Sequence, residues 1–244
     1  MIWKKSSFIS LFVLILILSA CNGTATSEQI YNHLEKAVEH EQTFEKQQNQ
    51  IVELEQEEQE IYSEIIDLSM EEFDQIEELA NQGLDNIETR SEKIDLEKES
   101  IDASREEFSN IEDMIGDLEE ESANEKADQM YSTMMERYNA YDKLHESYSE
   151  SLTLEEELYT MLQQEDLEQE TLSDHITNLN ESYQNVIESN ETFNQLTDDY
   201  NGLKEEFYQA AGIEVEYEEN PGSGEQESNS DESTESEQEA ESDE

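Results

Sequence analysis

The chain has 244 residues, of which 67 are Asp or Glu and 12 are Lys or Arg, so its formal net charge is −55. A charge this negative excludes electrostatic attachment to DNA, RNA or anionic lipid, because phosphate contacts need clustered Lys and Arg. One Cys excludes an internal disulfide framework and a zinc site with several thiolates. One Pro and seven Gly argue against a loop-rich enzyme or an all-β sandwich, which leaves acidic disorder or long solvated helices.

The first twenty residues are typical of an export signal. Lys4 and Lys5 form a basic start, and an apolar run interrupted only by Ser10 extends from Phe8 to Leu18. A helix of that length spans about 17 Å, against roughly 30 Å for the hydrocarbon core of a bilayer. The run is therefore too short for an ordinary spanning helix, and it fits the apolar region of a signal peptide over residues 1–20.

Residues Leu18-Ser19-Ala20-Cys21 resemble the lipobox of bacterial lipoproteins. The resemblance implies that a diacylglycerol thioether forms on Cys21 and that lipoprotein signal peptidase cuts between Ala20 and Cys21. It also implies an acyl chain such as palmitate on the new N-terminus. The alternative is an ordinary signal peptide with an incidental Cys. Because two or more acyl chains anchor a protein stably, we expect residues 21–27 to be a lipid anchor and spacer.

Residues 28–212 show helical periodicity and contain no Pro. In the first segment apolar residues recur at steps of three and four, and we expect this helix to end near Asp67. Ser69 and Glu72 then fit a capping box at the start of the next helix. A seven-residue series follows, which is typical of coiled-coil packing: Phe73, Ala80, Ile87, Ile94, Ile101, Phe108 and Ile115. Between these residues lie four weak layers, Gly83, Arg90, Glu97 and Ser104.

Two further helices are predicted after this series. The regular spacing of apolar residues is lost between Leu118 and Ala127, which indicates a turn over residues 119–124. A Tyr-rich series then runs to Leu162, and Thr153 and Glu156 fit another capping box that would kink this helix near residue 152. The pattern breaks again over residues 164–166. The last series ends at Gly212, a residue type preferred just after a helix: Leu172, Leu179, Val186, Phe193, Tyr200 and Phe207.

Helices of about 40 to 50 residues would be roughly 60 to 75 Å long. A single helix of this kind leaves its apolar stripe in water, whereas antiparallel hairpins bury it. We therefore predict an all-α fold, an elongated antiparallel bundle or coiled coil of about four long helices over residues 28–212. The alternative is an extended coiled-coil dimer with fewer turns, which keeps self-association open. Residues 213–244 hold 14 acidic residues and no Lys or Arg, which predicts a disordered tail.

No set of residues predicts catalysis or a cofactor. His33 and His40 lie seven apart and could bind a metal, but polar layers of a coiled coil are the simpler interpretation, and no second cluster completes a metal shell. Asp142 and His145 are the nearest match to the Glu-x-x-His pairs of di-metal bundles, without an equivalent elsewhere. Five tyrosines could stack on sugar rings, yet their heptad spacing favours core positions: Tyr131, Tyr138, Tyr141, Tyr148 and Tyr159.

The lipobox, the stretch Glu157-Leu158-Tyr159 before Asp166-Leu167, and the closing Glu206-Phe-Tyr-x-Ala-Ala-Gly212 together resemble the YkyA-type family of cell-wall binding lipoproteins from Gram-positive bacteria. The resemblance covers roughly residues 1–213. It implies a non-enzymatic protein, lipid-anchored on the extracytoplasmic face of the cell membrane, with peptidoglycan or cell-wall proteins as partners. A cation-binding or hydrolytic bundle is the alternative. The mature body, residues 21–212, carries a charge of −43, so anionic wall polymers would repel it at low salt.

Overall fold

The computed structural model describes residues 13–14 and 26–217. Cys21 and most of the predicted tail lie outside the described residues, so the predictions for the signal peptide, the lipid anchor and the tail remain predictions. One unit contains strands β1 (Val13–Leu14) and β2 (Glu216–Tyr217), which pair antiparallel with Val13 opposite Tyr217. The second unit is a helical body. Within the described ranges, no helix is both long enough and apolar enough to cross a membrane.

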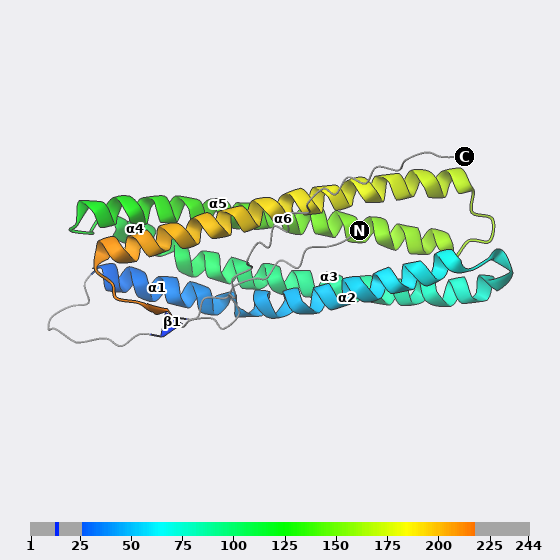
Figure 1. Ribbon diagram of the computed structural model, residues 1–244, viewed down its shortest axis with the longest axis horizontal. Helices are drawn as coiled ribbons and strands as arrows, with labels where there is room; N and C mark the ends of the chain where they lie inside the picture. The colour runs from blue at the N-terminus through cyan, green and yellow to red at the C-terminus, as the bar shows by residue number, and fades with distance from the viewer. Residues whose placement is uncertain (1–12, 15–25, 218–244) are drawn as a thin grey trace, which may run out of the picture. The chain divides into compact units, whose positions relative to one another are not determined.

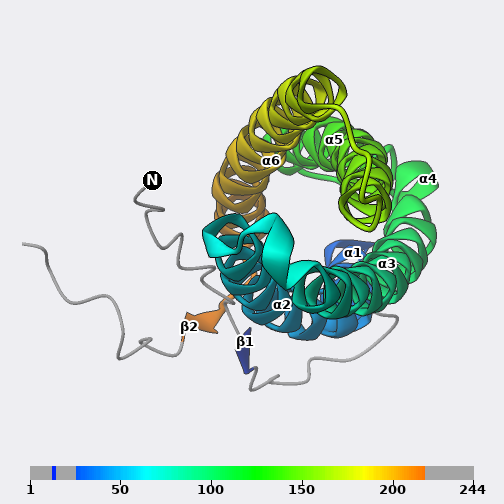
Figure 2. The same cartoon turned by 90° about the vertical axis from the view of Figure 1, so that its right-hand side faces the viewer.

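The helical body confirms the predicted all-α bundle of four long rods. Its α2 helix turns back onto α3, α3 turns back onto α5, and α5 turns back onto α6, so neighbouring rods are antiparallel (Figures 1 and 2). α1 and α2 follow each other and form the first rod. The elements in chain order are α1 (Thr26–His40), α2 (Gln42–Asp67), the 3₁₀ turn η1 (Met70–Glu72), α3 (Phe73–Ser109), α4 (Glu112–Ile115), α5 (Glu121–Leu162) and α6 (Gln169–Ala211).

A break at Glu41 divides the first rod, which the sequence predicts as one helix. The hydroxyl of Ser100 on α3 accepts a hydrogen bond from the Phe44 N–H at 3.1 Å and donates one to the carbonyl of His40. An uninterrupted helix would join these two backbone groups directly. The inserted side chain of Ser100 therefore replaces one bond of the helix, which is a known cause of helix kinks.

Two predicted helix boundaries are confirmed by their capping geometry. The Ser69 N–H and hydroxyl both donate to the Glu72 carboxylate, at 3.2 and 3.0 Å, which completes the capping box before α3. At the end of α6, Gly212 has a φ of 67°, a left-handed conformation that favours glycine. The Ile213 N–H donates to the Tyr208 carbonyl at 2.9 Å and closes this helix.

Two other details differ from the sequence prediction. α3 ends at Ser109, and the short helix α4 occupies part of the connection. α5 already begins at Glu121, so most of the turn predicted over residues 119–124 is helical. Ile111 and Ile115 are still buried in the connection, so the apolar repeat continues beyond the end of α3. α5 passes residue 152 without interruption. The Thr153 hydroxyl donates to the Ser149 carbonyl at 3.0 Å within the helix and does not cap a new one.

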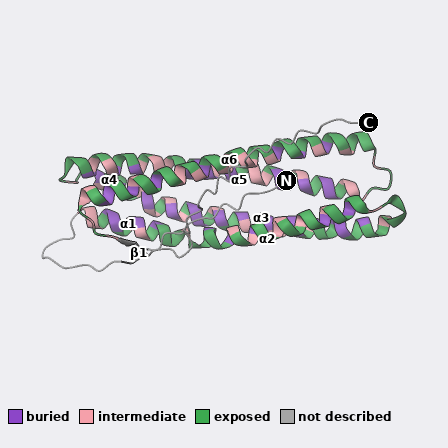
Figure 3. Ribbon diagram, in the orientation of Figure 1, coloured by how far each residue is buried: buried purple, intermediate pink, exposed green. Residues whose placement is uncertain are grey.

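The buried residues form stripes along the inward faces of the rods (Figure 3). The weak layers predicted for α3, Gly83, Arg90, Glu97 and Ser104, are all buried among them. At Gly83 the rods approach closely, since a Cβ added there would lie 2.5 Å from the ring of Tyr159 on α5. The predicted heptad series supply buried core residues from α3, α4 and α6, among them Ala80, Ile87, Ile94, Ile101, Phe108, Ile115, Leu179, Phe193, Tyr200 and Phe207.

Candidate functional site

Ionisable side chains lie inside the helical body at several levels along its length. Burying a charge is costly unless a partner and hydrogen bonds compensate, so each level must supply its own partners. From the end near Thr26 towards the α2–α3 turn, the levels are Lys204 near Glu35, Arg137 with Glu41, Glu97 with Gln48 and Tyr141, and Arg90 with Glu155, Glu55 and Glu58.

Arg137 of α5 joins three rods through a buried ion pair. Its Nη1 and Nη2 atoms donate to the two carboxylate oxygens of Glu41 at 2.8 Å each, and its Nε donates to the Thr197 hydroxyl of α6 at 2.8 Å. The guanidinium carbon also lies 4.6 Å from the ring centroid of Phe193. Burial by itself would lower the pKa of Arg137, but the nearby Glu41 carboxylate raises it. The side chain therefore stays charged and holds the α1–α2 junction to α5 and α6.

A second buried ion pair lies nearer the α2–α3 turn. Arg90 of α3 donates to both carboxylate oxygens of Glu155 on α5, and its Nε donates to the Asn86 side chain at 2.9 Å. The hydroxyl of Tyr183 on α6 donates to Glu155 at 2.8 Å. Burial by itself would lower the pKa of Arg90, whereas the attraction of Glu155 raises it. The pair thus connects α3, α5 and α6 through hydrogen bonds to a single carboxylate.

Two carboxyl groups of α2 face the same ion pair. The Tyr148 hydroxyl donates to Glu55 at 2.9 Å, and the Tyr159 hydroxyl donates to Glu58 at 2.7 Å. Burial raises the pKa of both glutamates, and the charge of Glu155 raises the pKa of Glu58 further. The positive charge of Arg90 lowers the pKa of Glu55 and Glu58, but burial has the larger effect on both.

Glu97 lies between these two ion pairs with uncharged partners. Its side chain accepts hydrogen bonds from the Gln48 amide at 2.8 Å and from the Tyr141 hydroxyl at 3.3 Å. The residue is 3% exposed, and burial raises its pKa to about 8. At neutral pH the protonated, uncharged form of Glu97 therefore predominates, which makes a carboxyl group tolerable at a core position.

The sequence reveals Arg90 and Glu97 as weak heptad layers, but it does not reveal Arg137 or Lys204 as interior cations. Arg137 is 3% and Lys204 is 7% exposed. Burial lowers the pKa of Lys204, and its ammonium lies 5.4 Å from the ring centroid of Tyr200. A usable signal exists, since Lys204 follows Tyr200 by four residues and precedes Phe207 by three, which is the phase of the apolar stripe.

The structure places His33 and His40 in separate surroundings. The Nδ1 atom of His33 lies 2.8 Å from a Glu107 carboxylate oxygen on α3, which makes His33 one member of an inter-helix pair. His40 is exposed in the last turn of α1. Across the part of the chain that the structure describes, no group of three or more His, Cys, Asp or Glu side chains could hold a metal ion.

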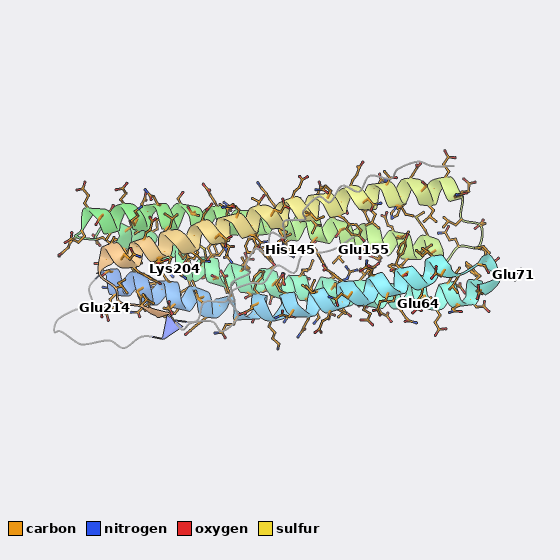
Figure 4. All side chains as sticks on the ribbon, in the orientation of Figure 1. Glu64, Glu71, His145, Glu155, Lys204 and Glu214 are labelled. Atoms are coloured by element: carbon orange, nitrogen blue, oxygen red, sulfur yellow. The ribbon has the colours of Figure 1, made fainter. Side chains whose placement is uncertain are left out.

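Asp142 and His145 also have partners other than a metal. Asp142 accepts a hydrogen bond from Arg105 at 2.9 Å, and His145 Nε2 lies 3.6 Å from Asp95 Oδ1 (His145 is labelled in Figure 4). All five tyrosines of the heptad series in α5 are at least partly buried, and their hydroxyls and rings contact other rods: Tyr131, Tyr138, Tyr141, Tyr148 and Tyr159. This agrees with core positions and not with an exposed platform for sugar rings.

One depression of about 360 Å³ lies between α5 and α6. Two of the residues that line it, Ser147 and Ser189, have hydroxyls 3.2 Å apart. The lining side chains are small, polar or charged and include no aromatic ring: Ala140, Lys143, Glu146, Ser147, Asn185, Glu188, Ser189 and Thr192. Such an open, mixed lining selects no particular class of ligand, so the buried polar levels are the better-defined chemistry of this body, and their role is structural.

The chain can now be placed among known proteins. A family model described as "Putative cell-wall binding lipoprotein" (YkyA) matches residues 25–210. The chain belongs to the YkyA family. The "Uncharacterized lipoprotein YkyA" of Bacillus subtilis (strain 168) is 33% identical over 200 residues, which cover 82% of this chain and 90% of that protein. The family membership predicted from the lipobox and the closing motif is thereby confirmed.

The bundle also occurs in a solved structure. A 1.6 Å crystal structure of a conserved protein of unknown function from Staphylococcus aureus matches with a TM-score of 0.67. The match covers 78% of this YkyA-family chain and 97% of that chain, at 14% sequence identity. At this identity the likeness establishes a shared fold and carries no conclusion about function.

Proposed function

We propose that this YkyA-family chain is a membrane-anchored, extracytoplasmic lipoprotein whose bundle binds the cell wall or docks wall-associated proteins without catalysing a reaction. The family description supports wall binding, and the lipobox ending at Cys21 supports the lipid anchor. The main support for a non-enzymatic role is the set of contacts that the buried ionisable groups make inside the bundle. The buried ionisable groups Arg90, Arg137 and Glu97 all bond to other rods of the bundle, which leaves recognition to the outer surface.

The position of the proposed anchor determines which end of the bundle would lie next to the membrane. Cys21 precedes Thr26, where α1 begins, by five residues, which at about 3.5 Å per residue reach no farther than about 18 Å. The lipid would therefore hold the end of the body where α1 begins. The 42 residues of α5 span about 63 Å, so the α2–α3 turn would stand at the far end from the membrane.

The charge of the body restricts what the surface could bind. A body of charge −43 is repelled by anionic wall polymers, and salt at about 1 M shortens the screening length to roughly 3 Å. Contact with the wall would therefore use uncharged glycan or peptide, divalent cations as bridges, or a basic protein as an intermediary. Peptidoglycan freed of anionic polymers is the appropriate first ligand to test.

Co-sedimentation of the full chain with such peptidoglycan over a salt series tests wall binding. We expect binding that persists or increases between about 0.1 and 1 M NaCl, because salt weakens repulsion and leaves uncharged contacts intact. Absence of binding at every salt concentration, together with no crosslinks to wall proteins in intact envelopes, would contradict the proposal. A stoichiometric Ca²⁺ or Zn²⁺ site that survives about 0.5 M salt would instead favour the cation-binding alternative.

The anchor has a separate test. Cys21→Ala is expected to abolish both membrane fractionation and labelling with radioactive lipid precursors, because the thiol is the acylated group in the proposed pathway. Cys21→Ala protein that still fractionates with the membrane would show that the lipobox assignment is wrong.

A further inference from the structure

The turn between α2 and α3, which we call the α2–α3 tip and define as residues 66–72, exposes two large apolar side chains. Ile66 in the last turn of α2 and Met70 in η1 are each 62% exposed. Other exposed large apolar side chains of the described chain show less of their surface, Val38 at 38%, Leu96 at 43% and Val52 at 47%. Two exposed apolar side chains, four residues apart in the chain, thus lie in one turn at the end of the body.

The tip is held in one conformation by its own hydrogen bonds and by the core beneath it. The capping box between Ser69 and Glu72 fixes the turn. Leu68 packs against the buried cluster that includes Ile65 and Ile76 on either side of the turn. A partner that bound here would not have to order a flexible loop, which is one of the main costs of association.

The charge around the tip has one sign. Residues 60–78 contain eight Asp or Glu and no Lys or Arg, and Figure 4 shows Glu64 and Glu71 at this end of the body. Two of the other exposed apolar residues have cations close in sequence, since Val38 follows Lys36 by two residues and Leu96 lies between Lys93 and Lys98. A complementary partner therefore has an apolar pocket and a rim of Lys and Arg.

We propose that the α2–α3 tip is a docking surface for a basic, wall-associated protein that receives Ile66 and Met70 in an apolar pocket. The inference rests on the proposed function, because the anchor at Cys21 would direct the tip away from the membrane and towards the wall. A central apolar contact surrounded by charged groups is the common composition of a protein interface. A second copy of this chain or an anionic wall polymer would bring like charges together at the same place.

The test uses an amphipathic helical peptide of Leu and Lys as a probe and a Leu and Glu peptide as its charge control. Binding of the full chain in detergent is measured by fluorescence anisotropy at about 0.15 M salt. The double variant Ile66→Ser/Met70→Ser is expected to bind the Lys peptide roughly tenfold more weakly. The matched control Val38→Ser/Val52→Ser, which removes exposed apolar groups outside the tip, should change binding less than about twofold.

Both double variants keep every charged residue, so general attraction between an acidic body and a basic peptide is the same in each. Because the four replaced side chains are exposed, both variants should also keep the wild-type unfolding temperature. Equal losses in the two variants, or no loss in the tip variant, would overturn the proposal. So would concentration-dependent self-association that the tip variant abolishes, since the occupant would then be a second copy.

The proposed anchoring can fail independently of the tip. Membrane fractionation of Cys21→Ala reports the anchor and does not involve Ile66 or Met70. Tip-dependent binding of the Lys peptide, together with Cys21→Ala protein that remains on the membrane, would preserve the docking surface and reject the anchor. Correct fractionation without tip-dependent binding would preserve the anchor and reject the docking surface.

Discussion

The core of the helical body contains different kinds of side chain in its two halves. In the base half, towards Thr26, aromatic rings from all four rods meet. Measured between ring centroids, Phe193 of α6 lies 5.8 Å from Phe44 of α2 and 5.6 Å from Tyr141 of α5, and Phe108 of α3 lies 6.0 Å from Tyr200 of α6. In the tip half, towards the α2–α3 turn, the buried cluster is aliphatic apart from Tyr159 and comes from α2, α3 and α5. The aromatic cluster of the base half thus joins four rods, whereas the aliphatic cluster of the tip half joins three.

The difference decides how firmly α6 is held along its length. In the base half α6 is tied to other rods through Phe193 and Tyr200 and through the hydrogen bond from Arg137 to Thr197. In the tip half it lies along α5, where His175 Nε2 is 2.7 Å from the Leu154 carbonyl oxygen (Figure 2). α6 therefore has one half held by side chains of several rods and one half supported mainly by α5.

Removing the ion pair of the tip half should have the largest effect. Arg90→Leu is expected to lower the free energy of unfolding by about 3–5 kcal/mol, because Glu155 remains buried beside Glu55 and Glu58 without its cation. The deficit should shrink at low pH, where protonation removes the uncompensated charge. Urea unfolding followed by circular dichroism at two pH values measures both effects. The double variant Arg90→Leu/Glu155→Leu should recover most of the loss, and equal instability of single and double variants would contradict this account.

Removing an aromatic ring of the base half should release α6. Phe193→Ala is expected to lower the free energy of unfolding by about 3 kcal/mol, because a fully buried ring in contact with Phe44 and Tyr141 is lost. Hydrogen exchange along α6 should accelerate in the base half, where contacts with several rods are expected to protect the wild-type helix. The matched control Ile176→Ala truncates a half-buried residue of the tip half and should cost about 1 kcal/mol or less. If both substitutions cost the same, α6 is held uniformly and the comparison between the halves fails.

Glu97 should make the stability of the body depend on pH. Its folded-state pKa of about 8 lies above the value of about 4.3 for an unperturbed Glu, so between these values the folded state binds more protons than the unfolded state. Stability from this group is therefore fully present below about pH 4 and falls as pH rises to 8, by at most about 1.4 kcal/mol per pH unit. Denaturant midpoints over this range measure the slope. Glu97→Gln should flatten it, and an unchanged slope would assign the dependence to other carboxyls.

A further prediction concerns the spacing of α3 and α5. Gly83→Ala should destabilise the tip half by about 1–3 kcal/mol, because the new Cβ meets the Tyr159 ring. Gly202→Ala on α6 of the base half is the matched control, since nothing lies within 4 Å of its added Cβ and alanine favours helix. Gly202→Ala is expected to raise the free energy of unfolding by up to about 1 kcal/mol. Thermal unfolding measures both, and stabilisation by Gly83→Ala would mean that Tyr159 moves aside freely.

Features that depend on nearby residues could be predicted from the sequence. The seven-residue repeat predicts long helices because side chains three and four residues apart share a helix face. Two helix boundaries could be predicted because the unpaired backbone groups at a helix end find partners within a few residues. These are the Ser69 and Glu72 cap and the end of α6 at Gly212. Membership of the YkyA family likewise follows from short motifs and is confirmed by the match over residues 25–210.

Features that depend on contacts between distant rods were decided only by the tertiary structure. Ser100 interrupts the first rod from 56 residues away, and Arg137 meets Glu41 across 96 residues, so no local pattern shows either contact. The early end of α3 and the absence of a kink at Thr153 are of the same kind, because packing overrides a local preference. From the sequence alone followed four long amphipathic rods and two of their boundaries, the cap at Ser69 and the helix end at Gly212. Which polar residues enter the interior, and which apolar residues remain outside at Ile66 and Met70, followed only from the way the rods pack.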